Sequence, residues 1–273
     1  MQNTKQTTKQ TTNKWPFNKY EFYNKAVQSA AEDVKFYRRV YKKIRKNKLP
    51  VILREDFCGA GALSCEWVKL NSQFKSCGLD LDREPMDYGR KHYISKLNLD
   101  QQKRVALVKK DVLTLNLPAA DIAIAVNFSY FFFKKREILK RYFDNVYKSL
   151  NQEGLFIVDA FGGTQCTGEI EDKTKHKKFI YYWDQKNFDP ITNEAYFEIH
   201  FGYKGKKHKG VFTYDWRMWS LPEIREIMQE VGFQSTKVYW EGNDNKGNGN
   251  GEFRATEKGE ACESWIAYVV GVK

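Results

Sequence analysis

Short apolar runs alternate with stretches of helical spacing between residues 50 and 163, and this alternation constrains the fold more than any other feature. A short apolar run suits a buried strand, whereas apolar residues three or four positions apart suit one face of a helix. Strands that alternate with helices form parallel βαβ units, so we expect an open α/β sheet with helices on both faces. The predicted strands are residues 51–57, 75–82, 104–112, 121–128 and 154–163, and the predicted helices include residues 62–70 and 134–150.

The segments on either side of this core, which we place at residues 50–163, have other patterns. Residues 20–47 carry apolar side chains at helical spacing and predict a helical cap made of one long helix or two short ones. Residues 170–219 predict an antiparallel insertion that covers the substrate as a lid. Residues 221–273 predict a helix and a final strand pair joined by a glycine- and asparagine-rich loop. The lid strands are expected at residues 179–188, 195–203 and 210–219.

Composition limits the class of protein. Residues 1–14 form a polar tract with a KQTT repeat, and we expect a disordered tail because they bury too little apolar surface to offset their ordering entropy. Residues 15–273 are expected to form one domain, since 41% of the 273 residues are hydrophobic. No apolar run approaches the ~20 residues that span a bilayer, and no secretory signal is visible. The five scattered cysteines indicate free thiols, so we predict a cytoplasmic protein.

The net charge of +12 leaves two interpretations open. Lysines that are spread through the chain can simply form a solvated surface. A basic surface can also attract phosphate groups, including those of RNA. The local basic runs at residues 42–48 and 204–209 fit a helix end and a hairpin tip better than a nucleic-acid patch.

Polar side chains close four successive predicted strands. Glu55, Asp80 and Asp111 lie at or just after the ends of the first three, and Asn127 ends the fourth. Ligands of an open α/β sheet bind at the carboxyl ends of its strands, so we expect these side chains to share one site. Strand ends do not require carboxylates for structure. The set therefore favours a functional site over coincidence.

A turn with Gly59 and Gly61 follows the first strand and lets the backbone approach a ligand closely. Nicotinamide dinucleotides use the same architecture, but Ser64 occupies the third position of the glycine pattern. Glu55, four residues before the first glycine, would repel a pyrophosphate. The same carboxylate suits the sulfonium and ammonium groups of S-adenosylmethionine.

Five segments resemble the successive cofactor motifs of class I S-adenosylmethionine-dependent methyltransferases: LREDFCGAGALSCEWV, GLDLD, KKDV, AVNFSY and IVDAFGG. Three later segments, WDQKNFDP, FTYDWRMWSLPEIREIMQEVGF and SWIAYVVG, resemble one branch of that superfamily, which has the REDFCG motif and no settled substrate. The resemblance extends from Tyr20 to the C-terminus. It implies a Rossmann-like, seven-stranded, mostly parallel sheet with the last strand pair reversed.

The resemblance also implies a binding site for S-adenosylmethionine. Glu55 and the backbone of the glycine turn would hold the methionine moiety. Asp80 would bind the ribose, and Asp111 with Val112 would contact the adenine. Phe57 departs from the pattern, because it replaces the first glycine common in the superfamily. The implied cofactor-binding residues are Glu55, Asp56, Phe57, Cys58, Gly59, Gly61, Asp80, Leu81, Asp111, Val112 and Asn127.

Four residues are catalytic candidates on the substrate side. The segment NFSY resembles the NPPY-type segment of enzymes that methylate planar amino nitrogens, without its prolines. Asn127 would accept a hydrogen bond from the amine and Tyr130 would stack on it, unless the aromatic residues of this segment simply pack under the sheet edge. In the lid, His200 offers a titratable imidazole, and Arg217 would bind an anionic group or pair with Asp215. The four histidines have no ligand spacing, so no metal site is expected.

Together these patterns predict a methyltransferase that uses S-adenosylmethionine to methylate a nitrogen or oxygen of a small molecule beneath the lid. Methyl transfer depends mainly on positioning, so a conspicuous catalytic triad is not required. One alternative is a methyltransferase whose substrate is RNA or a protein side chain. Another is a catalytically silent scaffold that binds the cofactor. No membrane partner is expected, and the sequence does not predict the oligomeric state.

Overall fold

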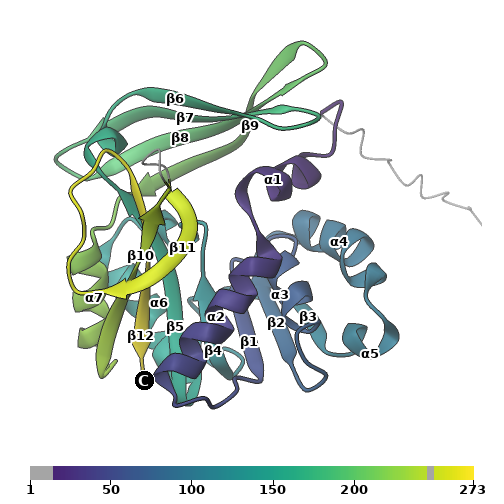
Figure 1. Ribbon diagram of the computed structural model, residues 1–273, viewed down its shortest axis with the longest axis vertical. Helices are drawn as coiled ribbons and strands as arrows, with labels where there is room; N and C mark the ends of the chain where they lie inside the picture. The colour runs from purple at the N-terminus through teal and green to yellow at the C-terminus, as the bar shows by residue number, and fades with distance from the viewer. Residues whose placement is uncertain (1–14, 245–248) are drawn as a thin grey trace, which may run out of the picture.

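The computed structural model describes residues 15–244 and 249–273, so the tail predicted at residues 1–14 lies outside the described residues. A large sheet with helices on both faces forms the body of the protein, and a smaller sheet lies across one end of it (Figure 1). Among the described residues, no helix is both long enough and apolar enough to cross a membrane.

The large sheet has eight strands in the order β11-β10-β12-β5-β4-β1-β2-β3. The strands from β3 to β5 are parallel, whereas β12 is antiparallel to both β5 and β10. Their bounds are β1 (Ile52–Asp56), β2 (Lys75–Asp80), β3 (Val105–Lys109), β4 (Ala120–Ala125), β5 (Leu150–Gly162), β10 (Ser235–Asn243), β11 (Gly249–Thr256) and β12 (Trp265–Val272).

Helices cover both faces of this sheet because each presents one apolar stripe. α2 and α3 pack on one face together with buried residues such as Trp67, and α6 and α7 pack on the other with residues such as Phe143. The helices are α1 (Lys19–Val27), α2 (Ala30–Ile44), α3 (Ala62–Trp67), α4 (Arg83–His92), α5 (Leu99–Gln102), α6 (Arg136–Ser149) and α7 (Leu221–Glu230), with short 3-10 turns η1 (Ile94–Lys96), η2 (Ser129–Phe132) and η3 (Thr164–Thr167).

The segment predicted to be an antiparallel insertion forms the smaller sheet, which we call the lid. Its strands pair in chain order and are β6 (Ile170–Lys175), β7 (Ile180–Asp189), β8 (Glu194–Tyr203) and β9 (Lys206–Arg217). The chain passes from the end of β5 through η3 into the lid, which lies over the carboxyl end of the large sheet (Figure 1).

The N-terminal cap has the second of its two expected forms, two helices, α1 and α2. Two other expectations change in detail. The sheet has eight strands rather than seven, because β11 forms within the segment predicted to be a loop. β11 is mostly exposed and has few apolar residues, so no periodicity of the sequence reveals it; backbone pairing with β10 and the packing of Phe253 against Phe36 and Tyr268 hold it. The lid also begins with β6, whose side chains are mostly exposed.

Candidate functional site

The turn after β1 has left-handed backbone at alternate residues. Phe57, Gly59 and Gly61 have φ values of 58°, 51° and 70°. Phe57 therefore keeps the backbone shape that a glycine would adopt in its place. Its ring lies 5.8 Å from that of Phe133 and 5.5 Å from that of Tyr142, and these aromatic contacts help to offset the strain of the left-handed conformation.

The two glycines of this turn have different surroundings. A Cβ atom at Gly61 would lie 2.6 Å from the side chain of Leu107, so the missing side chain lets the turn pack against β3. A Cβ atom at Gly59 would meet no atom of the described residues within 4 Å. The turn is thus packed on one side and open on the other, where its backbone is accessible to a ligand.

Asp80 ends β2 beside the open side of the turn. Its Oδ2 accepts a hydrogen bond of 2.7 Å from the backbone N–H of Gly59, and its Oδ1 accepts one of 2.9 Å from the N–H of Asp82. Each carboxylate oxygen has a further lone pair, so both can still accept from the hydroxyl groups of a ligand. The neighbouring Leu81 is 57% exposed and offers an apolar surface at the same place.

Glu55 is buried near the end of β1. Its Oε2 accepts hydrogen bonds from the backbone N–H and the hydroxyl of Ser64, at 2.9 and 2.6 Å, within the first turn of α3. Burial raises the pKa of Glu55 to about 7, the bonds from Ser64 oppose this, and the charge of Asp80 raises it further. Glu55 and Asp80 therefore repel each other, and a cation beside them would stabilise both carboxylates.

Asp56 was expected to bind the cofactor, but its side chain points away from the glycine turn. Successive residues of a strand point to opposite faces, so Asp56 faces α6 whereas Glu55 faces α3. Its buried carboxylate forms a two-bond ion pair with Arg54, at 2.8 and 3.2 Å, and accepts a hydrogen bond of 2.8 Å from the hydroxyl of Tyr142. We therefore correct the assignment: Asp56 anchors α6 to β1.

The other predicted cofactor residues lie at the same end of the sheet. Cys58 is buried against Leu107, so it can offer a ligand only its backbone. Asp111 follows β3 by two residues, and its Oδ1 accepts a hydrogen bond of 2.8 Å from the N–H of Leu113. Val112 beside it is 4% exposed and packs into the core.

A cavity of about 1240 Å³ lies between α2, the lid and the carboxyl ends of β4 and β5. Aromatic side chains form much of its wall, with Trp183, Tyr214 and Trp216 contributed by the lid. Asn127 and Phe128, which follow β4, also line it. Asn127 therefore keeps its place as a candidate on the substrate side, and Phe128 joins it.

Asp159 of β5 is a buried acid in the wall of this cavity. Its Oδ2 and Oδ1 accept hydrogen bonds of 2.7 and 2.9 Å from the backbone N–H groups of Asn127 and Phe128, both of which have a φ of 57°. Burial raises the pKa of Asp159 to about 7, these bonds oppose it, and the charge of Asp33 on α2 raises it further. Sequence reasoning gave Asp159 no role, although it lies near a strand end like the other acids.

Tyr130 does not reach the cavity. It is fully buried, its hydroxyl donates a hydrogen bond of 2.8 Å to the backbone oxygen of Asp159, and its ring lies 5.0 Å from that of Phe131. The expectation that Tyr130 stacks on an acceptor is therefore corrected. The alternative interpretation, packing under the sheet edge, describes this residue.

Arg217 also has structural partners. Its guanidinium donates to the backbone oxygen of Lys134 at 3.1 Å and to the carboxylate of Glu223 at 3.2 Å, and lies 3.9 Å from the ring centre of Trp219. The expected pairing with Asp215 is not made, because Asp215 pairs with Lys134 at 2.5 Å. Arg217 thus joins the lid to α7, and it is not part of the cavity wall.

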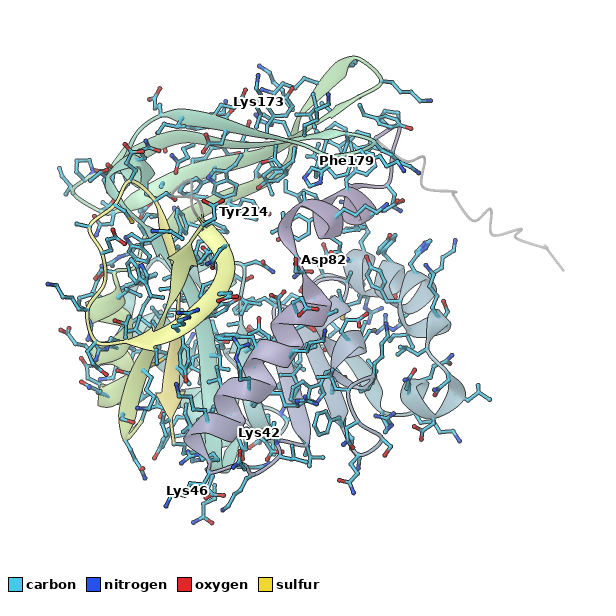
Figure 2. The ribbon with its side chains drawn as sticks, in the orientation of Figure 1. Lys42, Lys46, Asp82, Lys173, Phe179 and Tyr214 are labelled. Carbon is cyan, nitrogen blue, oxygen red and sulfur yellow. The ribbon has the colours of Figure 1, made fainter. Side chains whose placement is uncertain are left out.

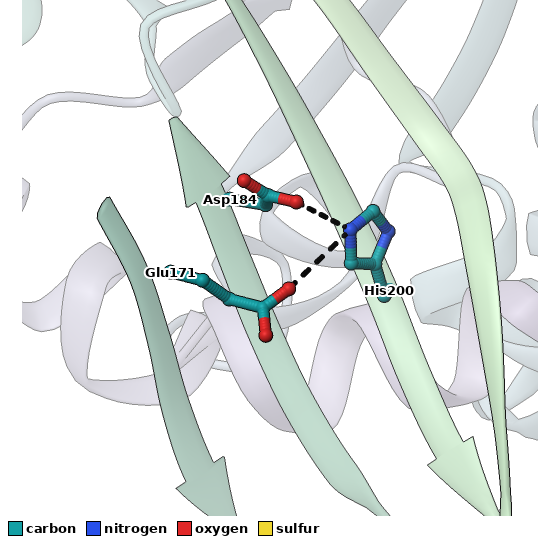
Figure 3. Close-up of side chains that lie close together, drawn as sticks. All are labelled: Glu171, Asp184 and His200. Carbon is teal, nitrogen blue, oxygen red and sulfur yellow. Dashed lines mark hydrogen bonds and ion pairs between the residues drawn. The ribbon is translucent and has the colours of Figure 1, made fainter. Parts of the chain in front are cut away.

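His200 lies in the middle of the lid and is fully buried. Its Nδ1 accepts a hydrogen bond of 2.9 Å from the N–H of Gly210, so a neutral ring carries its proton on Nε2 and donates it to Asp184 at 2.8 Å (Figure 3). The neighbouring Ile199 lines the cavity, whereas His200 points to the other face of β8. His200 therefore stabilises the lid, and its expected role as a catalytic base is not supported.

His200 and two acids form a cluster that the sequence does not reveal, because its members come from three strands. One ligand atom each from Glu171, Asp184 and His200 lie within 4.8 Å of one another (Figure 3). Their existing partners argue against a metal ion. Nε2 of His200 carries a proton, and the two carboxylates already form ion pairs with Lys207 and Lys186. We assign no metal to this cluster.

Neither a family model nor a curated protein matches the chain, but solved structures match its fold. An S-adenosylmethionine-dependent methyltransferase from Clostridium acetobutylicum is 18% identical with a TM-score of 0.64, over 92% of this chain and 96% of that one. An amino pentose methyltransferase from Micromonospora echinaspora is 13% identical with a TM-score of 0.62, over 94% of this chain and 99% of that one. A sugar N-methyltransferase from Streptoalloteichus is 14% identical with a TM-score of 0.61, over 100% of this chain and 99% of that one. At these identities the likeness shows the fold alone, a mostly parallel α/β sheet with helices on both faces.

Proposed function

We propose that this chain transfers a methyl group from S-adenosylmethionine to a nitrogen or oxygen of a small molecule. The observation that carries the proposal is the pair of acids, Glu55 and Asp80, beside the open glycine turn. S-adenosylmethionine is positively charged at its sulfonium and ammonium groups, and when bound it supplies an electrophilic methyl group. A nicotinamide dinucleotide would instead place a pyrophosphate beside these two acids, which is unfavourable.

The chain's own residues fit the parts of this cofactor by their chemistry. Asp80 has acceptors for the two ribose hydroxyls, and Glu55 has a carboxylate for the ammonium group, directly or through water. Gly59 leaves open space for the ligand beside the backbone. Asp111 with Val112 would meet the adenine.

The cavity supports a small-molecule acceptor, because its wall is largely aromatic and the lid helps to exclude water from it. The basic runs of the sequence lie where they were expected, at the end of α2 and in the turn between β8 and β9. Lys42 and Lys46 lie well below Tyr214 in the view of Figure 2, but Lys43 of the same run lines the cavity, so the basic runs do not decide between a small acceptor and RNA. The solved structures of similar fold include amino pentose and sugar methyltransferases, which also favours a small acceptor over RNA.

Two experiments test this proposal in sequence. Titration calorimetry should give micromolar binding of S-adenosylhomocysteine, and the melting temperature should rise with it. No binding at millimolar ligand would overturn the cofactor assignment. Incubation of the protein with isotopically labelled S-adenosylmethionine, a metabolite extract and RNA should then label a small molecule. Label found only in RNA or protein would overturn the acceptor class, and binding without any label would favour a scaffold.

A further inference from the structure

We infer that the acceptor is an amine, held as its ammonium ion by Asp33 and Asp159 between the aromatic walls of the cavity. This inference rests on the proposed function for the reaction, but not for the binding. It begins from the two acids, which approach the cavity from different elements: Asp159 from β5 and Asp33 from α2.

The carboxylate of Asp159 is fixed in direction by the rest of the fold. The backbone N–H groups of Asn127 and Phe128 each bond one of its oxygens, and the residue is 6% exposed. Each oxygen keeps one further lone pair for a ligand. The carboxylate is therefore oriented before any ligand binds, which lowers the entropy lost on binding.

Lys35, Arg39, Lys43 and Arg254 also line the cavity, but Asp33 and Asp159 have no direct ion-pair partner within the part of the chain that the structure describes. Asp56 is the informative comparison for Asp159, since this acid is also buried but is paired with Arg54. The charge of Asp33 raises the pKa of Asp159, and both acids raise the pKa of the phenol groups of Tyr37 and Tyr268, so the two carboxylates act on the same region of the cavity. Asp159 is buried and Asp33 is half-buried, and like charges in such places without an ion-pair partner are costly unless a cation joins them.

The aromatic walls suit the same cation. Tyr214 projects from the lid into the space above the large sheet (Figure 2), and its ring lies 4.4 Å from that of Trp216. Trp183 continues this surface, with its ring 6.2 Å from that of Trp216. The faces of Trp and Tyr attract ammonium ions, and their carbon atoms pack against the apolar body of a ligand. An alcohol of the same shape would gain the apolar contacts but would not stabilise the two carboxylates.

The two acids also explain how an ammonium ion becomes reactive. An ammonium nitrogen has no lone pair, so it must lose a proton before it can be methylated. The N–H bond breaks, its electron pair stays on the nitrogen, and the proton passes to a carboxylate oxygen of Asp159. Burial and the charge of Asp33 raise the pKa of Asp159 to about 7, so this carboxylate holds a proton better than an exposed aspartate does.

Binding of matched amines and alcohols to the full chain tests the inference without any turnover. The pairs are tyramine and tyrosol, cyclohexylamine and cyclohexanol, and glucosamine and glucose, followed at pH 8 by calorimetry and by tryptophan fluorescence. The amine of at least one pair should bind about tenfold more tightly than its alcohol, as expected for a hydrogen bond to a charged group. Equal affinity within every pair, or no binding of any amine at millimolar concentration, would overturn the inference.

Two variants test the acids themselves. Asp33→Asn and Asp159→Asn should each abolish the preference for the amine and leave the alcohol's affinity unchanged. Asp159 also holds the turn at Asn127, so Asp33→Asn decides the outcome if the other variant does not fold. Asp87→Asn on α4, whose side chain is 68% exposed, is the control and should keep the preference. An unchanged preference in folded Asp33→Asn would overturn the inference.

Titration with S-adenosylhomocysteine separates this inference from the proposed function. Binding of that ligand without a preference for amines overturns the amine inference alone. A preference for amines without binding of that ligand overturns the proposed function and leaves the amine site standing.

Discussion

The carboxylate of Asp80 accepts a 2.7 Å hydrogen bond from the backbone N–H of Gly59, and this bond joins the end of β2 to the turn after β1. The sequence suggested that both residues contact a ligand. The structure adds that they contact each other, so Asp80 shapes the turn as well as offering acceptors for ribose hydroxyls. Replacing Asp80 therefore changes both the shape and the chemistry of the site.

Asp80→Ala should weaken S-adenosylhomocysteine binding by about 100-fold, since it removes the acceptors of two hydroxyls and the anchor of the turn. Asp80→Asn keeps one carbonyl acceptor and should lose about tenfold. Calorimetry measures both affinities, with Asp87→Asn as the control for a lost surface charge. Unchanged affinity in folded Asp80→Ala would remove Asp80 from the site.

Arg54→Met should lower the free energy of unfolding by about 3–5 kcal/mol, because it leaves the carboxylate of Asp56 buried without its partner. The double variant with Asp56→Leu should recover much of this loss, since neither charge then remains in the core. Urea unfolding measures the free energies. Affinity of the folded protein for S-adenosylhomocysteine should stay the same in both variants, and a loss of affinity at full stability would return Asp56 to the cofactor site.

Arg217→Ala should lower the free energy of unfolding by about 1–3 kcal/mol, because it breaks the contacts with Lys134, Glu223 and the ring of Trp219. We expect a smaller loss for Arg217→Lys, which keeps the charge but not the forked geometry. Thermal and urea unfolding check both values. Full stability together with complete loss of turnover would instead make Arg217 a substrate residue.

Local patterns predicted the order of strands and helices in the core, because each pattern needs only the spacing of neighbouring residues. They also predicted that Glu55, Asp80 and Asp111 gather at one end of the sheet, since parallel strands end together. Strand β11 was missed because it is held by pairing with β10 and by the packing of Phe253 against Phe36 and Tyr268, which are distant in the sequence, rather than by a periodic pattern of its own. The eighth strand therefore depends on tertiary contacts, which a local sequence pattern does not contain.

The wrong role predictions have one common cause: the sequence does not show in which direction a side chain points. Tyr130 and Arg217 have suitable chemistry at suitable places in the sequence, but the packing around them decides whether they face the cavity or the core. Asp33 is the opposite case, because no role was predicted for it and yet it lines the cavity. Its position on α2 carries no signal of function, and only the docking of that helix brings it to the cavity opposite Asp159.

Glu55 makes the ligand-free protein less stable as the pH rises. The pKa of its carboxyl group is raised from 4.5 to about 7 on folding, so the folded state binds this proton more tightly than the unfolded state does. The contribution of this group to stability therefore falls as the pH rises from 4.5 to about 7 and stays low above it. A rise of the pKa from 4.5 to about 7 corresponds to about 3 kcal/mol.

Glu55→Gln should therefore raise the free energy of unfolding of the ligand-free protein by about 2–3 kcal/mol at pH 8, and change it little at pH 5. The amide oxygen of glutamine can keep both bonds from Ser64, because a single oxygen of Glu55 accepts both. The same change should weaken binding of S-adenosylhomocysteine about tenfold, since the ammonium group loses its anion. Urea unfolding at the two pH values and calorimetry test this, with Glu66→Gln on α3 as the control. Equal stability of the variant at pH 8 and the native chain would show that the charge of Glu55 is already compensated within the fold, and a cation would then no longer be needed to explain the site.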